Sequence, residues 1–324
     1  MFLGLPRYTR DGATPSLVRR ERDGSLRPFP GGDWNAWEPG RDGSAAFVYL
    51  NAVHIFDDDT VWCVDQGAPN EGVFPGYGTP APGAQKIVQL DAGSGEILRI
   101  LRFNEAMLPP GGQLNDLRRL GDLLYITDSG LGGIIVHDLV SGVSKRRLSE
   151  QHVTQSSPAR IPPVLAHIHG DKPFRPPNSD LIEITPDGKW LYWASPTGPL
   201  YRTETRRLLD PEISDEALSA HVERVFDNAF SGGCTMDSNG NIYFSETATN
   251  RITVLAPDGR STTLISDPVL VRPDGGFISQ NRILYLPVKK PLGDDAGKPV
   301  YGIYALSLPD TIADIPLGTA IGSR

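Results

Sequence analysis

Polar side chains that carry oxygen atoms recur at one position of a repeated sequence pattern. When the repeats are aligned on an aromatic residue in their second strand, this position holds Gly232, with Gly318 as a sixth member, and four oxygen-bearing residues: Asn51, Asn115, Asp180 and Asp274. Carboxylate and amide oxygens that converge on one point suit a hard cation such as Ca²⁺, or hydrogen-bond the ammonium or hydroxyl groups of a small ligand. We therefore predict a ligand-binding and candidate Ca²⁺ site there. Hydrogen bonding to nearby backbone N–H groups is the alternative.

Proton transfer near neutral pH would use a carboxylate or a histidine next to this position. The candidate catalytic carboxylates are Asp116, which directly follows Asn115, and Asp180. The candidate histidine is His169, because it lies in a proline-rich stretch, residues 156–177, that leads into Asp180. Long connections of this kind are either functional or disordered, and an ordinary surface-loop role is the alternative for His169.

For two further residues, a functional role competes with a role in packing. His54 lies three residues after Asn51 on a predicted inner strand, and we expect it to be a core residue that faces the neighbouring repeat. Trp37 lies with Trp34 in a long connection, where it could form the wall of a site for an aromatic ligand. Packing over the top of a repeat explains Trp37 equally well.

A second aligned position, at the end of the second strand, also carries polar side chains. Its regularity indicates a structural role, because such groups commonly tie one repeat to the next through hydrogen bonds to turn amides. Four residues occupy it: Asp65, Asp128, Ser195 and Glu246.

The elements that position these residues are repeats of about four short strands each. Each repeat starts with a small or polar residue and an alternating strand, and continues through a short turn into a strand with an aromatic residue near its start. Short strands in groups of four, about 40 to 50 residues apart, are typical of propeller blades. The first two strands of five repeats cover residues 50–65, 114–128, 179–195, 231–246 and 273–286.

The sixth blade must come from the two ends of the chain. Residues 2–7, 16–20 and 26–28 supply its second, third and fourth strands, and the isolated strand 315–324 supplies the missing first one. Closure of this kind leaves no long exposed sheet edge. The predicted fold is therefore all-β, a six-bladed β-propeller that forms one domain over residues 1–324, with blade six closed by N-terminal and C-terminal strands.

Composition narrows the function classes. The 35 glycines and 29 prolines indicate many turns, and a net charge of −8 with a pI near 5.3 argues against a nucleic-acid partner. No apolar run is long enough to cross a membrane, and no signal peptide opens the chain. Two cysteines cannot form a disulfide framework. The motifs of serine hydrolases, zincins, NTPases and thiol redox enzymes are missing. We expect a monomer whose partner is a small molecule.

Several motifs, in this order, resemble the yellow and major royal jelly protein family over nearly the whole chain. Residues 2–7, FLGLPR, are similar to that family's opening strand followed by Pro-Arg. Residues 61–67, VWCVDQG, are similar to its strand that ends in Asp-Thr-Gly. Residues 114–118, LNDLR, with 125–130, YITDSG, resemble its most recognisable stretch.

The chain departs from the family in two respects. Family members are usually secreted and carry a Pro-Leu-Gly strand before the opening motif, whereas here Pro316-Leu317-Gly318 lies at the opposite end. A circular permutation would explain this order, and it leaves localisation open. The family's usual cysteine pairs are also absent.

The resemblance implies an isomerase or tautomerase that acts on a dopachrome-like or other small cyclic substrate by proton transfer, or a non-catalytic binder of aromatic amines. A Ca²⁺-dependent lactonase or hydrolase of the six-bladed propeller type is a further alternative, in which the metal would polarise the lactone carbonyl. The ring of aligned residues lacks a glutamate, which argues against that alternative.

Overall fold

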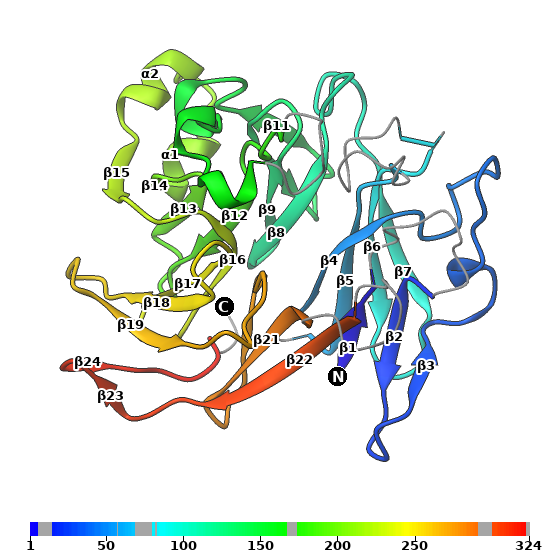
Figure 1. The fold of residues 1–324 in the computed structure, drawn as a ribbon. Coiled ribbons are helices and arrows are strands. Elements are labelled where there is room, and N and C mark those ends of the chain that lie inside the picture. Colours follow the sequence, from blue (N-terminus) through cyan, green and yellow to red (C-terminus); the bar gives the residue numbers. More distant parts are fainter. Residues whose placement is uncertain are drawn as a thin grey trace. The chain divides into compact units, whose positions relative to one another are not determined.

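The computed structural model describes residues 1–5, 15–56, 58–68, 80–81, 83–166, 174–290 and 300–321 (Figure 1). They form two compact units, Met1–Arg146 and Arg147–Arg324. Both units consist mainly of antiparallel sheets of three or four short strands. No helix in the described ranges is long and apolar enough to cross a membrane.

The first unit holds three sheets in chain order. The first sheet is followed by a short 3-10 helix at Gly32–Asn35. The strands of the first sheet are β1 (Phe2–Gly4), β2 (Leu17–Arg20) and β3 (Leu26–Pro28). Those of the second are β4 (Leu50–Ile55), β5 (Thr60–Asp65), β6 (Lys86–Asp91) and β7 (Ile97–Leu101). Those of the third are β8 (Leu114–Leu120), β9 (Leu123–Asp128), β10 (Ile134–Asp138) and β11 (Ser144–Arg147).

The second unit begins with three short 3-10 helices, His152–Thr154, Pro158–Arg160 and Pro163–Leu165, and then holds three more sheets and a hairpin. Its first sheet has strands β12 (Leu181–Ile184), β13 (Trp190–Ala194), β14 (Leu200–Glu204) and β15 (Glu223–Phe226), with helices α1 (Thr205–Leu209) and α2 (Asp215–Ala220) between the last two. Its second has β16 (Ser231–Met236), β17 (Ile242–Glu246), β18 (Arg251–Leu255) and β19 (Ser261–Ser266). Its third has β20 (Phe277–Ile278), β21 (Ile283–Lys290) and β22 (Val300–Ser307), and the hairpin has β23 (Thr311–Ile312) and β24 (Ile315–Pro316).

These six sheets confirm the predicted fold, a six-bladed β-propeller. Within each unit the first strands of successive blades contact one another, β1 with β4 and β4 with β8 in the first unit, and β12 with β16 and β16 with β20 in the second. This is the arrangement that brings equivalent residues of neighbouring blades together.

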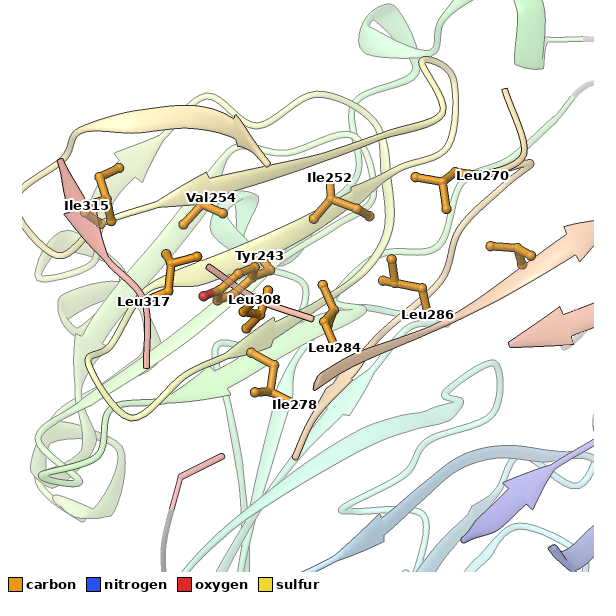
Figure 2. Close-up of a cluster of buried hydrophobic side chains, with 12 residues drawn as sticks. Tyr243, Ile252, Val254, Leu270, Ile278, Leu284, Leu286, Leu308, Ile315 and Leu317 are labelled. Carbon is orange, nitrogen blue, oxygen red and sulfur yellow. The ribbon is translucent and has the colours of Figure 1, made fainter. Parts of the chain in front are cut away.

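Apolar side chains fill the spaces between neighbouring blades. In the first unit, Trp62 and Leu117 belong to one fully buried cluster that joins the second and third blades. In the second unit, Figure 2 shows the cluster between its last two blades, where Tyr243 and Val254 lie with Leu284 and Leu308. Each blade thus buries apolar side chains of its sheet against the neighbouring blades, and this burial supplies stability that a single blade lacks.

A β-bulge interrupts three first strands at the same place. The pairing with the second strand shifts between Leu50 and Ala52 in β4, between Leu114 and Leu117 in β8, and between Ser231 and Gly233 in β16. A bulge inserts an extra residue and re-aims the side chains beside it. The bulges in β4 and β8 therefore decide the direction of the predicted site residues Asn51, Asn115 and Asp116.

The C-terminal segment is part of the second unit. In its described part, residues 315–321, β24 pairs with β23. The backbone N–H of Gly318 donates to the buried carboxylate of Asp237 at 2.7 Å, and Ala320 N–H donates to the Ser279 carbonyl at 3.2 Å. These hydrogen bonds hold the segment against residues of the second unit.

Candidate functional site

A histidine, an aspartate and an arginine meet between the second and third blades of the first unit. His54 lies on β4, and Asp116 and Arg118 lie on β8, the neighbouring first strand. The Nε2 atom of His54 is 2.5 Å from Oδ1 of Asp116, and Nη1 of Arg118 is 3.0 Å from Oδ2 of the same carboxylate. One carboxylate thus links the imidazole of one blade to the guanidinium of the next.

The surroundings of Asp116 keep it ionised. Burial would raise the pKa of this carboxyl, but the Arg118 guanidinium and the hydrogen-bonded His54 together hold it well below its usual range. The backbone N–H of Leu117 also donates to Oδ1 at 2.7 Å. Since the carboxylate accepts hydrogen bonds and cannot donate them, the His54 Nε2 atom must carry the proton of their contact.

The second ring nitrogen of His54 is then the basic one. In the part of the chain that the structure describes, Nδ1 makes no hydrogen bond. The His54 side chain is 24% exposed and that of Asp116 is 21% exposed, so the pair lies at a surface that solvent or a ligand reaches. Phe56 stacks on the His54 ring with centroids 5.8 Å apart and fixes its plane. A histidine held in this way is suited to general acid–base chemistry.

A second polar group lies at the bulged starts of the same two strands. Asn51 Nδ2 donates to both the backbone oxygen and the Oδ1 atom of Asn115, at 3.0 and 2.6 Å. Gln66 Nε2 donates to the same Oδ1 atom at 3.0 Å. The structure therefore brings together two of the aligned residues, Asn51 and Asn115, and adds a glutamine that the sequence analysis did not single out.

The side-chain amides of Asn51 and Asn115 are not oriented to form the predicted Ca²⁺ site. The Asn115 Oδ1 atom already accepts two hydrogen bonds, which occupy both of its lone pairs, and Asn51 presents its nitrogen to it. Oxygen ligands of Ca²⁺ must be turned toward the ion. Among the described residues, no group of three or more His, Cys, Asp or Glu side chains is placed to hold a metal ion.

The remaining aligned residues lie in the second unit. Asp180 precedes β12, and its backbone N–H donates to the Ala194 carbonyl at 2.9 Å. Asp274 is exposed, and its Oδ1 accepts the Gly275 N–H at 2.7 Å, a local turn contact of the kind named as the alternative. Gly232 lies against Asp274, because a Cβ atom on this glycine would be 3.4 Å from the Asp274 Cα. His169, the predicted catalytic histidine, falls outside the described residues.

Trp37 takes the packing role. It is 5% exposed and belongs to a small cluster with Ala46, Val48 and Ala84. Its indole N–H donates to the Arg41 carbonyl at 3.0 Å, so its polar atom is satisfied inside the fold.

The second aligned position has the structural role that was predicted. Asp65 accepts the backbone N–H groups of Val48 and Tyr49 at 2.9 and 2.8 Å and pairs with the buried Lys86 at 2.8 Å. Asp128 likewise accepts backbone N–H groups and pairs with Arg146, whereas Glu246 pairs with the Arg251 side chain and Ser195 hydrogen-bonds the Thr197 hydroxyl.

Sequence reasoning missed His54, Arg118 and Gln66 as site residues. It placed His54 toward the neighbouring blade, as observed, but took that position for a core site. One signal was available: His54 and Arg118 each lie three residues after an aligned asparagine, Asn51 and Asn115. Equivalent polar residues on neighbouring first strands predict a contact between blades.

Comparisons with known proteins identify the fold. No family model matches the chain, and no curated protein matches its sequence. A candidate 6-phosphogluconolactonase from Bacteroides uniformis is similar in structure, with a TM-score of 0.53 and 16% identity over 98% of this chain and 80% of that one.

Two other solved structures are similar at comparable identity. Regucalcin, a calcium-binding protein from Agrobacterium tumefaciens, has a TM-score of 0.51 and 15% identity over 86% of this chain and 80% of that one. Virginiamycin B lyase from Staphylococcus aureus has a TM-score of 0.48 and 14% identity over 85% of this chain and 71% of that one. At these identities the first two likenesses establish a shared propeller fold and leave the function to be argued from the site.

Proposed function

We propose that this chain is an enzyme that acts on a small molecule and uses His54 as its general base and acid. The observation that carries the proposal is the 2.5 Å contact between His54 Nε2 and Asp116 Oδ1 at a partly exposed surface. A carboxylate at one ring nitrogen fixes the tautomer, leaves the other nitrogen basic, and stabilises the imidazolium that forms when this nitrogen takes a proton.

The reaction that we propose is hydrolysis of a lactone. His54 Nδ1 takes a proton from a water molecule as that water attacks the lactone carbonyl carbon. The ring C–O bond then breaks, and the imidazolium returns the proton to the leaving alkoxide oxygen, which gives a hydroxy acid. Asp116 keeps its negative charge throughout, because Arg118 is bound to its second oxygen at 3.0 Å. The likeness to the candidate 6-phosphogluconolactonase supports the choice of a lactone.

Ca²⁺ enters no step of this proposal. A bound cation would polarise the lactone carbonyl, as the likeness to calcium-binding regucalcin would suggest. The Asn51 and Asn115 amides are instead engaged with each other. A Ca²⁺ site at these residues would require Asn115 to give up the hydrogen bonds from Asn51 and Gln66.

A second candidate is a proton-transfer isomerase or tautomerase of the yellow and major royal jelly type. One observation favours it: the stretch with the strongest resemblance to that family, residues 114–118 and 125–130, is the stretch that carries Asp116 and Arg118. A histidine that accepts and returns one proton would also serve this reaction. It would take the proton from a substrate carbon instead of from water.

One assay series separates these candidates. Purified protein is tested on a panel of lactones and on dopachrome-like substrates, before and after dialysis against EDTA, together with a His54→Gln variant. A His221→Gln variant serves as the control, because His221 is an exposed histidine at the end of α2.

The proposal predicts lactone turnover that His54→Gln removes and that EDTA leaves intact. Turnover of dopachrome-like substrates alone would favour the isomerase. Activity lost with EDTA and restored by Ca²⁺ would favour the metal-dependent hydrolase. Tight binding of aromatic amines without turnover of any substrate would show a binding protein and would contradict an enzymatic role.

A further inference from the structure

Asn51 presents an unused hydrogen-bond acceptor next to the His54 site. Its Nδ2 atom has two protons, and both are donated to Asn115, at 3.0 Å to the backbone oxygen and 2.6 Å to Oδ1. Its own Oδ1 accepts no hydrogen bond from the described residues. Asn51 is half-buried, whereas Asn115 is 4% exposed, so the asparagine that keeps an open oxygen is the more accessible of the two.

A buried glutamine fixes the direction of this oxygen. Gln66 is 4% exposed, and its Nε2 atom donates to Asn115 Oδ1 at 3.0 Å. Because that oxygen receives protons from Gln66 and Asn51, the Asn51 amide cannot turn over without placing two oxygens against each other. The three residues form an amide clamp, Gln66–Asn115–Asn51, and the clamp turns the Asn51 side-chain carbonyl away from Asn115.

The bulge in β4 gives Asn51 and His54 the same neighbour. In a regular strand, residues three apart point to opposite faces of the sheet. Here the pairing shifts at Asn51, and both side chains reach β8, Asn51 at Asn115 and His54 at Asp116. Their Cα atoms are at most about 10 Å apart along the strand, which is the span of a small molecule.

From this arrangement we propose that Asn51 determines specificity: its Oδ1 atom accepts a hydrogen bond from a hydroxyl or ammonium group of the substrate whose reactive carbon lies at His54. The Asn51 Oδ1 atom is neutral, and both N–H groups of the same amide are already donated to Asn115. The site therefore favours ligands that carry a hydrogen-bond donor and cannot form a hydrogen bond with an ether, ester or alkyl group. The inference rests on the proposed role of His54 for the position of the reactive carbon, but the acceptor itself stands on the amide clamp alone.

The test compares substrates that differ in one donor group. The probes are δ-valerolactone, its hydroxymethyl derivative and its dimethylaminomethyl derivative, which carries an ammonium N–H near neutral pH. With wild-type protein, kcat/KM is expected to be higher for at least one derivative than for the parent, and the derivative that gains shows whether the donor is a hydroxyl or an ammonium. In Asn51→Leu the gain is expected to fall by about tenfold to a hundredfold, while the parent changes by less than about threefold.

A Gln66→Met variant leaves Asn51 in place and removes the clamp, and it is expected to lose part of the same gain. Equal losses for all three lactones in both variants would show a structural role for Asn51 and overturn the inference. An unchanged gain in Asn51→Leu would overturn it as well.

Failure of lactone turnover would be distinguishable from failure of this inference. If wild-type protein hydrolyses none of the lactones, the hydroxy acids that correspond to them are titrated by calorimetry instead. If an acid that carries a hydrogen-bond donor binds, and Asn51→Leu weakens this binding at least tenfold, Asn51 is supported as a hydrogen-bond acceptor even though the proposed reaction is not. Binding that does not depend on Asn51, or no binding at all, would refute it.

Discussion

His54 and Asp116 are 62 residues apart in the chain, yet their side chains meet at 2.5 Å between two adjacent blades. Each comes from the first strand of its blade, and the buried cluster that contains Trp62 and Leu117 packs these blades together. The distance between the proposed base, His54, and the Asp116 carboxylate is therefore set by the packing of one blade on the next. Shape changes in this cluster should alter catalysis as well as stability.

The charge of Asp116 predicts a contribution to stability that depends on pH. Since the folded-state pKa of this carboxyl is held below its ordinary value of 3.8, the stabilisation is fully present above about pH 4 and is lost as the pH falls further. Asp116→Asn should therefore unfold with a smaller dependence on pH below about pH 4 than the wild type does. Urea unfolding at a series of pH values measures this slope, and an unchanged slope would contradict the assigned ion pairing.

Protonation of His137 should destabilise the folded state. It is 6% exposed, and burial, together with the charge of Arg99, lowers its pKa below the ordinary value of 6.5. The unfolded chain thus binds a proton near pH 6.5 that the folded chain does not, so stability falls as the pH drops below this value. His137→Gln should reduce this loss between about pH 5 and 7, whereas His221→Gln should leave it unchanged. Thermal unfolding across this range is the measurement.

Lys86 and Asp65 form a fully buried ion pair at 2.8 Å, and Lys86 also donates to the carbonyls of Gly43, Ala46 and Ala84. Lys86→Met removes one charge and leaves the other buried, which should lower the free energy of unfolding by about 3 to 5 kcal/mol. The double variant Lys86→Met/Asp65→Asn should be more stable than Lys86→Met alone. If the double variant is the less stable of the two, the uncompensated charge is not the cause.

Asp237 anchors the C-terminal segment. Its buried carboxylate accepts the Gly318 N–H at 2.7 Å, the Tyr243 hydroxyl at 2.8 Å and both the backbone and side-chain N–H groups of Asn241 at 3.0 and 2.8 Å. Asp237→Ala should destabilise the fold by about 2 kcal/mol or more, because several buried donors lose their acceptor. Hydrogen exchange should accelerate at Gly318 first.

The control for this prediction is Asp187→Ala, in an exposed turn where Asp187 accepts hydrogen bonds from Thr185 and Lys189. It should leave the exchange of the C-terminal segment unchanged. Slow exchange at Gly318 in Asp237→Ala would show that another contact holds the segment.

The repeats could be read from the sequence because their signals are local: alternating apolar residues, turn residues and an aromatic residue near the start of each second strand. The same alignment correctly paired Asn51 with Asn115. His54 was assigned to the core because strand alternation does not reveal the β-bulge in β4, and the equivalent spacing of His54 and Arg118 after Asn51 and Asn115 was not used. The position of the C-terminal segment depends on Asp237, which lies 81 residues before Gly318 and has no local signal for that contact.

The most direct test of the central claim is the pH dependence of kcat/KM on a lactone that the wild type hydrolyses, measured for the wild type, His54→Gln and His221→Gln. We expect His54→Gln to lose the pH dependence that the wild type shows, together with about a hundredfold to ten-thousandfold of its activity, with folding intact. His221→Gln should match the wild type. Activity in His54→Gln within about threefold of the wild type, with the same pH profile, would contradict the account.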